Sequence, residues 1–85
     1  RDVVLAVEVL FSTLKADHRK AGVYARAGVP VYWLLDVVGR RVEVHTQPVP
    51  AGNYEVVTIL GPTATVSPPG VDATWTVAEL LPPQS

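Results

Sequence analysis

The sequence contains no cysteine, which excludes a disulfide framework and any metal site built on thiolates. It has no apolar run near the ~18–20 residues of a membrane span and no segment patterned like a signal peptide. Charged residues are scarce at 18%, and the formal net charge is −1, so any contact with phosphates must come from a local patch. We therefore expect a soluble, cytoplasmic domain without membrane contacts.

Apolar residues, in contrast, make up 48% of the 85 positions, which is enough for a folded core. This length allows a single domain. The low charge indicates that a partner or further chain covers some apolar surface. Arg1 leads almost directly into the apolar stretch 3–10, so we expect an N-terminally truncated chain that forms one partial domain over residues 1–85.

The residue pattern predicts the elements in the order β-α-β-β-β-(β)-α. The near-continuous apolarity of residues 3–10 predicts a central strand covered on both faces, and residues 14–27 predict one long helix ended by Gly28 and Pro30. Residues 31–37 and 41–45 predict a hairpin that turns at 38–40 and buries Trp33. Residues 47–53 read as a loop, 54–60 as a strand, and 63–66 as a brief strand. Thr74 is the expected cap of a final helical turn at 77–80. The expected fold class is α/β (α+β): a mixed sheet with one long helix packed on it.

Glu8 is the most informative single residue, because it is the one charge inside the first predicted strand. An unpaired buried carboxylate costs several kcal/mol. Either a bound metal cation compensates its burial, or Glu8 points to solvent or forms an ion pair with the helix. The strand alone favours neither reading.

The helix after that strand carries a basic cluster, formed by Lys15, His18, Arg19 and Lys20. Such a cluster is most often an ordinary solvated helix face. Here, however, a lysine one or two turns into the helix can return over the end of the strand that carries Glu8, which is where α/β folds place their sites.

Several segments together resemble one known signature. These are Val7-Glu8-Val9, Ser12-Thr13, Asp17, Lys20, the run from Tyr24 to Pro30, the run from Tyr32 to Asp36, and the closing run from Trp75 to Leu81. The pattern resembles that of the Uma-type restriction endonucleases in the PD-(D/E)xK nuclease superfamily, in roughly the second half of the family domain. The resemblance implies a restriction-endonuclease-like fold and hydrolysis of DNA with Mg²⁺ or Mn²⁺. It is also compatible with a homodimer.

The resemblance also implies roles for individual residues. Glu8 matches the glutamate that binds the metal, and Lys20 matches a lysine that the family has moved from the strand to the helix. Its ammonium group would orient the attacking water and stabilise charge on the phosphate. Tyr24 is expected to pack against the sheet, and Gly28, Pro30 and Trp33 are expected to be structural.

Three departures from the family pattern affect the site. Val31 stands where the family usually has glutamate. The interval from Asp17 to Lys20 is one residue short, which would rotate Lys20 by ~100° on the helix and favour Arg19 or His18 instead. The third concerns the aspartate that the superfamily takes from the preceding strand. Asp2 lies six residues before Glu8, or about 20 Å along an unbroken strand, so we expect this aspartate upstream of Arg1.

Two further readings come from other function classes. One is a non-catalytic remnant or nucleic-acid-binding module that keeps the fold but not the metal. The other is an oligomerisation piece whose sheet edge pairs with another chain. Nothing in these residues indicates which DNA sequence would be recognised, how the DNA would be cut or what the physiological target is.

Overall fold

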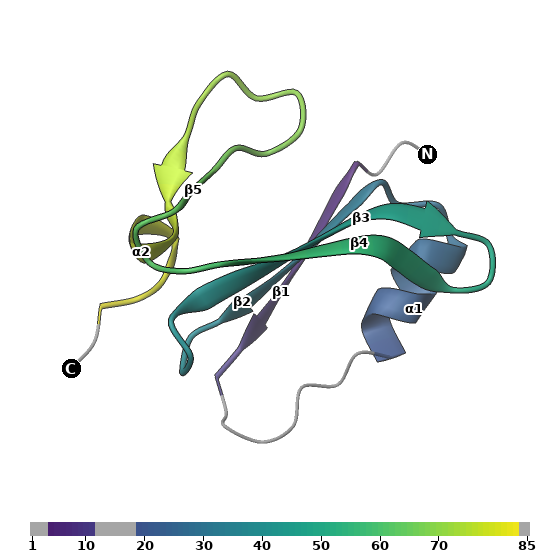
Figure 1. The fold of residues 1–85 in the computed structure, drawn as a ribbon, viewed down its shortest axis with the longest axis horizontal. Coiled ribbons are helices and arrows are strands. Elements are labelled where there is room, and N and C mark those ends of the chain that lie inside the picture. Colours follow the sequence, from purple (N-terminus) through teal and green to yellow (C-terminus); the bar gives the residue numbers. More distant parts are fainter. Residues whose placement is uncertain (1–3, 12–18, 84–85) are drawn as a thin grey trace.

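The computed structural model describes residues 4–11 and 19–83 of the chain (Figure 1). The elements are β1 (Leu5–Leu10), α1 (Arg19–Arg26), β2 (Val31–Asp36), β3 (Arg41–Val49), β4 (Asn53–Leu60), β5 (Thr65–Val66), β6 (Trp75–Thr76) and α2 (Val77–Leu80). The fold is α+β with a mixed sheet, as expected. Neither described helix has the length and apolar composition that crossing a bilayer requires.

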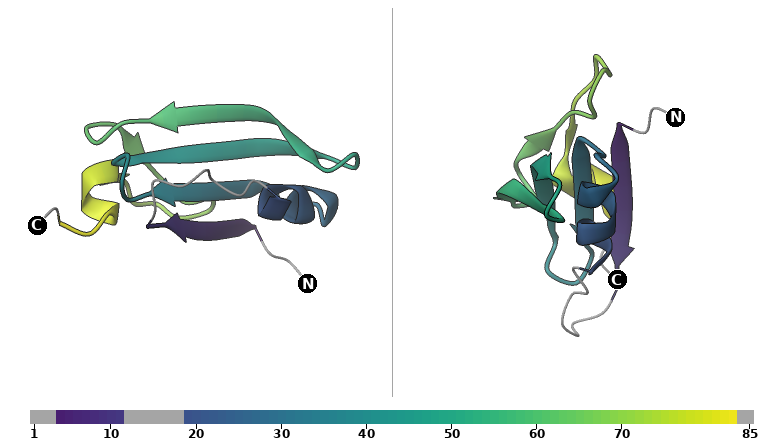
Figure 2. Two further views of the ribbon diagram at one scale, coloured as in Figure 1. Left: turned by 90° about the horizontal axis from the view of Figure 1, so that it is seen from below. Right: turned by 90° about the vertical axis from the view of Figure 1, so that its right-hand side faces the viewer.

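The main sheet has four strands in the order β1-β2-β3-β4, which the left view of Figure 2 shows edge to edge. β1 runs parallel to β2, whereas β2, β3 and β4 pair antiparallel. The register places Glu8 beside Leu34, and Leu34 beside Glu43. Because side chains directly opposite each other share a face of the sheet, these three lie in one row.

The prediction of a central first strand is wrong for the described part of the chain, in which β1 is an edge strand. Its residues alternate between the two faces: Ala6 is buried and Glu8 is partly buried, whereas Val7 and Val9 are each 46% exposed. A continuous run of apolar residues does not distinguish a strand covered on both faces from an edge strand that leaves one face open.

Helix α1 is described over the eight residues Arg19–Arg26. The predicted start at residue 14 lies outside the described residues, so one long helix is not shown. The predicted end is confirmed: Gly28 adopts φ +77°, and its N–H donates to the Ala25 carbonyl at 3.0 Å. Glycine reaches this left-handed conformation without a steric penalty, which turns the chain toward β2.

Two hydrophobic clusters form the core, one on each face of the sheet. On the face that α1 covers, the buried residues are Ala6, Ala21, Ala25, Val29, Tyr32, Leu34 and Tyr54. On the other face they are Trp33, Leu35, Val42, Val66, Val77 and Leu81, contributed by the sheet, β5, α2 and the residue after it. The two helices lie at opposite ends of the sheet (Figure 1).

The hairpin turns at the predicted place and buries Trp33, but two local predictions are wrong. β3 continues through Val49, where a loop was expected. Pro48 lacks an N–H, yet it fits because β2 pairs with β3 only as far as Thr46, which leaves that side of Pro48 without a ladder partner. The cap of α2 is Thr76 rather than Thr74, and Thr76 forms a capping box with Glu79.

Replacing Trp33 with alanine tests the importance of the second cluster. Trp33 is 5% exposed, so Trp33→Ala is expected to lower the free energy of unfolding by about 3–5 kcal/mol. Trp75 is 37% exposed, and Trp75→Ala should cost no more than about 1 kcal/mol. Urea unfolding followed by circular dichroism measures both, with Trp33→Phe as a milder variant should Trp33→Ala not fold. Equal losses for Trp33→Ala and Trp75→Ala, or no loss at all for Trp33→Phe, would contradict this core assignment.

Candidate functional site

The site is centred on the carboxylate of Glu8, which projects from β1 on the face that α1 covers. The Lys20 Nζ lies 3.3 Å from Glu8 Oε1, and the Tyr24 hydroxyl donates a hydrogen bond to Oε2 at 3.0 Å. The Glu8 side chain is 26% exposed and the Lys20 side chain 62% exposed. The carboxylate is therefore held by two donors and still accessible from solvent.

Helix geometry explains why both donors reach the same carboxylate. Lys20 and Tyr24 are four residues apart, so they lie one turn apart on the same side of α1. Ala21 and Ala25, one position after each, are buried against the sheet. Their small side chains let the helix approach closely, and the Cβ that a side chain at Gly22 would add lies 3.1 Å from the Gly52 carbonyl oxygen.

The Tyr24 ring lies against a group of aromatic rings on this face. Its centroid is 5.4 Å from that of Tyr32, which in turn contacts His45 at 5.1 Å and Tyr54 at 6.2 Å. Burial, together with the negative charge of Glu8, raises the pKa of Tyr32 to about 12. The Tyr54 hydroxyl donates to the Val29 carbonyl at 2.8 Å. These phenols are therefore protonated at neutral pH, and Tyr24 acts toward Glu8 as a hydrogen-bond donor.

A second polar pair lies on the same face of the sheet, in β3. His45 Nε2 and Glu43 Oε1 are 3.1 Å apart, and both side chains are largely buried. Sequence reasoning treated residues 41–45 only as an alternating strand and missed this pair. The available signal was the alternation itself, since residues two apart in a strand share a face.

Asp36 ends β2, but its carboxylate belongs to the hairpin turn. The Gly39 N–H donates to Oδ1 at 2.8 Å, and Arg41 Nε donates to Oδ2 at 3.1 Å. A Cβ at position 39 would lie 2.5 Å from Oδ2, so a side chain there would displace the Asp36 carboxylate. Asp36 therefore stabilises the turn and is not part of the Glu8 site.

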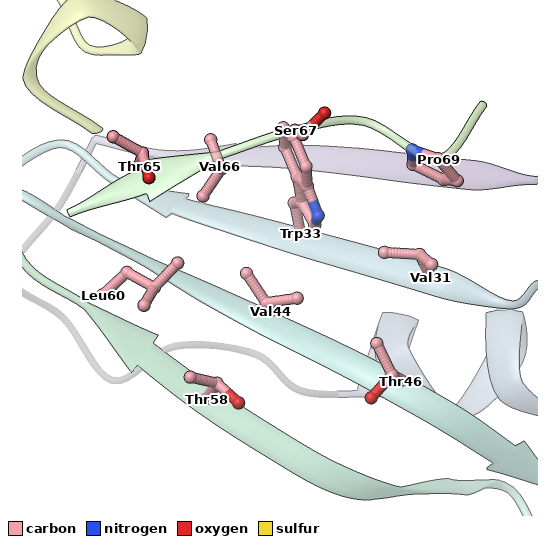
Figure 3. A pocket seen from close by; sticks show the side chains of 10 residues that line it. All are labelled: Val31, Trp33, Val44, Thr46, Thr58, Leu60, Thr65, Val66, Ser67 and Pro69. Atoms are coloured by element: carbon pink, nitrogen blue, oxygen red, sulfur yellow. The ribbon is translucent and has the colours of Figure 1, made fainter. Parts of the chain in front are cut away.

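A cavity of about 310 Å³ lies on the opposite face of the sheet (Figure 3). Its lining is mostly apolar and includes Val31, Trp33, Val44, Thr46, Thr58, Leu60, Thr65, Val66, Ser67 and Pro69. None of the described residues that line it is charged, and it lies across the sheet from Glu8. Val31, where the resemblance leads one to expect glutamate, points into this cavity, so that departure does not alter the Glu8 site.

The structure brings together Glu8 and Lys20, the two residues predicted as the site, with Lys20 Nζ 3.3 Å from Glu8 Oε1. The short interval before Lys20 does not turn it away from Glu8. Lys15, His18 and the alternative carboxylates Asp2 and Asp17 lie outside the described residues, as does the Arg19 side chain. Tyr24 was predicted to pack against the sheet, which it does, but its hydrogen bond to Glu8 was missed.

The donor set at Glu8 is partly suited to a divalent cation. Carboxylate oxygens are the ligands that Mg²⁺ prefers, and Glu8 provides one accessible carboxylate. Within residues 4–11 and 19–83, no three His, Cys, Asp or Glu side chains gather closely enough to hold a metal ion together. Glu8 can therefore contribute one ligand to a cation, and further ligands would have to come from substrate or from other residues.

The sequence model of the Uma2 family, described as "Putative restriction endonuclease", matches residues 1–80. The chain belongs to this family. The small α+β structure with a mixed four-stranded sheet is consistent with a restriction-endonuclease-like fold, and membership of the Uma2 family points to a nuclease function. No curated protein and no solved structure matches the chain at a significant level.

The contacts of Glu8 with Lys20 and Tyr24 predict how substitutions of Glu8 and Lys20 change the pKa of the Tyr24 hydroxyl in the metal-free Uma2 chain. The pKa of Tyr24 is raised above 10.0 by its hydrogen bond to Glu8, then by burial and by the charge of Glu8, whereas the charge of Lys20 lowers it. Glu8→Gln is expected to lower the pKa of Tyr24, because phenolate no longer faces an anion. Lys20→Met should raise it by a smaller amount.

Nuclear magnetic resonance of tyrosine ring carbons measures this titration, with Tyr54 as the internal reference because the charge of Glu8 is not among the causes of its raised pKa. Unchanged Tyr24 titration in Glu8→Gln would show that the hydrogen bond is absent in solution.

Proposed function

We propose that this Uma2 domain hydrolyses phosphodiester bonds of DNA with the help of Mg²⁺ or Mn²⁺, using Glu8 and Lys20. The observation that carries the proposal is the 3.3 Å contact between Lys20 Nζ and Glu8 Oε1 in a chain of a restriction endonuclease family. Nuclease chemistry requires a carboxylate for the metal and a cationic group for the phosphate, and this pair provides one of each.

Glu8 is the residue that would hold the cation. A divalent cation there would lower the pKa of water and offset negative charge on the scissile phosphate. Glu8 lies in the sheet, where the hydrogen-bonded strand fixes its backbone, and its carboxylate remains accessible to solvent. A ligand on a regular strand keeps its position when the surrounding loops change conformation.

Lys20 is the residue that would act on the substrate. Its side chain is largely exposed, so the ammonium group can leave Glu8 and meet a phosphate oxygen without unfolding the helix. It provides three N–H donors and a fixed positive charge, which suit both the orientation of the attacking water and the charge that develops on phosphorus-bound oxygens.

A complete metal site needs more than Glu8. Mg²⁺ is usually held by one or two carboxylates together with substrate phosphates, and Glu8 is the carboxylate that the described residues place beside Lys20. We propose that the second one is the family aspartate, carried by sequence upstream of Arg1. We also propose a cytoplasmic location, for which the lack of cysteine is the support. We propose a homodimer on the basis of the family resemblance.

A plasmid-nicking assay tests the function. The 85-residue chain alone is expected to show no cleavage with Mg²⁺ or Mn²⁺, because a single carboxylate beside a lysine binds the cation weakly. A version extended upstream should cleave, and Glu8→Ala should abolish that cleavage. Activity of the 85-residue chain that depends on Glu8 would show that the second carboxylate lies within it. An inactive extended version would favour the non-catalytic remnant or binding module.

Replacing Lys20 separates its effect on the cation from its effect on the reaction. In the extended version, Lys20→Met is expected to strengthen Mn²⁺ binding by about 2–5-fold, because a competing positive charge is removed. The same change should slow cleavage by about 10²–10³-fold, because a donor to the phosphate is lost. Calorimetry measures the first effect and single-turnover cleavage the second.

Arg26→Met is the matched control for that experiment. Arg26 is a cation in the last turn of the same helix. It follows Lys20 by six residues, so the two side chains point about 120° apart around the helix axis. Removing it should leave both quantities nearly unchanged. Equal effects of the two substitutions would mean that Lys20 acts only through the net charge of the helix.

A further inference from the structure

The two oxygens of Glu8 are held by two different donors from the same helix. Lys20 Nζ lies 3.3 Å from Oε1, and the Tyr24 hydroxyl lies 3.0 Å from Oε2. A carboxylate bound at one oxygen can still rotate about its last torsion, whereas a carboxylate bound at both has a defined plane. In the absence of a cation, the orientation of Glu8 is therefore set by α1.

These two donors differ in how firmly they are held. The Tyr24 ring packs against the buried cluster on the α1 face and lies 5.4 Å from the ring of Tyr32, which is 1% exposed. A phenol has two side-chain torsions, and here ring packing restricts both. Lys20 has four torsions, and its side chain is 62% exposed. An arriving cation would therefore displace Lys20 more easily than Tyr24.

We propose that Tyr24 is a positioning residue for Glu8, which holds Oε2 so that Oε1 is the oxygen offered to the divalent cation. This inference rests on the proposed function. Lys20 Nζ would yield its place at Oε1 to the cation and become available to the phosphate. Tyr24 would keep its hydrogen bond to Oε2, so Glu8 would offer the cation one oxygen.

The coordination chemistry of Mg²⁺ explains why a fixed orientation of the Glu8 carboxylate would favour its binding. Mg²⁺ requires near-ideal octahedral geometry, whereas Ca²⁺ accepts irregular sites and carboxylates that bind through both oxygens. A carboxylate with one oxygen held by a phenol presents a single ligand atom in a fixed direction. Hydrogen bonds of this kind to metal ligands commonly contribute about 10–100-fold to metal affinity.

Tyr24→Phe tests the inference, because it removes the hydroxyl and keeps the ring. Binding of Mn²⁺ to the version extended upstream, measured by calorimetry without DNA, is expected to weaken by about 10–100-fold. The loss for Ca²⁺ should be smaller, since a freed Oε2 allows two-oxygen binding. Tyr54→Phe is the matched control: it also removes a phenol hydroxyl from the aromatic group, but that hydroxyl donates to the Val29 carbonyl.

The outcomes distinguish the inference from the function on which it rests. Weaker Mn²⁺ binding in Tyr24→Phe and Glu8→Gln, with unchanged binding in Tyr54→Phe, supports the inference. Unchanged binding in Tyr24→Phe, or equal losses in Tyr24→Phe and Tyr54→Phe, overturns the role of Tyr24 and leaves the proposed function intact. If the extended version without substitutions shows no Mn²⁺ binding that depends on Glu8, the proposed function fails and the inference fails with it.

Discussion

The parallel pairing of β1 with β2 is the constraint on which the rest of the structure depends. Parallel neighbours cannot be joined by a tight turn, so the connection must cross one face of the sheet, and α1 lies on that crossover. The helix buries Ala21 and Ala25 against the sheet. The residues one position earlier, Lys20 and Tyr24, then lie beside the buried stripe and reach Glu8. The topology and two alanines thus place both donors of the site.

The energetics of Glu8 follow from this placement. A partly buried carboxylate without partners would cost several kcal/mol, but Lys20 and Tyr24 satisfy both of its oxygens. The folded chain therefore needs no cation to stabilise Glu8. An ion pair with so exposed a lysine contributes only about 0–1 kcal/mol. Giving up the Lys20 contact at Oε1 would therefore cost little, which is compatible with the proposed exchange of Lys20 for a divalent cation.

The sequence predicted the proximity of Glu8 and Lys20 through the family resemblance, and because a lysine one or two turns into the helix can return over the end of the preceding strand. It did not predict that β1 is an edge strand of the described sheet. An apolar run indicates that its residues prefer to be buried, but not how many strands lie beside it. Thr76 was identifiable as the cap, because Glu79 follows at capping-box spacing. The hydrogen bond of Tyr24 was not, because it depends on the distance between α1 and β1.

The two faces of the sheet explain which departures from the family pattern affect the chemistry. Val31 and Trp33 point to the face opposite Glu8 and line the apolar cavity there. Valine at position 31 therefore extends an apolar surface and removes no charge from the side of the sheet that carries Glu8. Substitutions on the cavity face would change stability, whereas those that touch Glu8, Lys20 or Tyr24 would affect the proposed binding of a cation. Strand parity thus separates the folding role of the sheet from its proposed catalytic role.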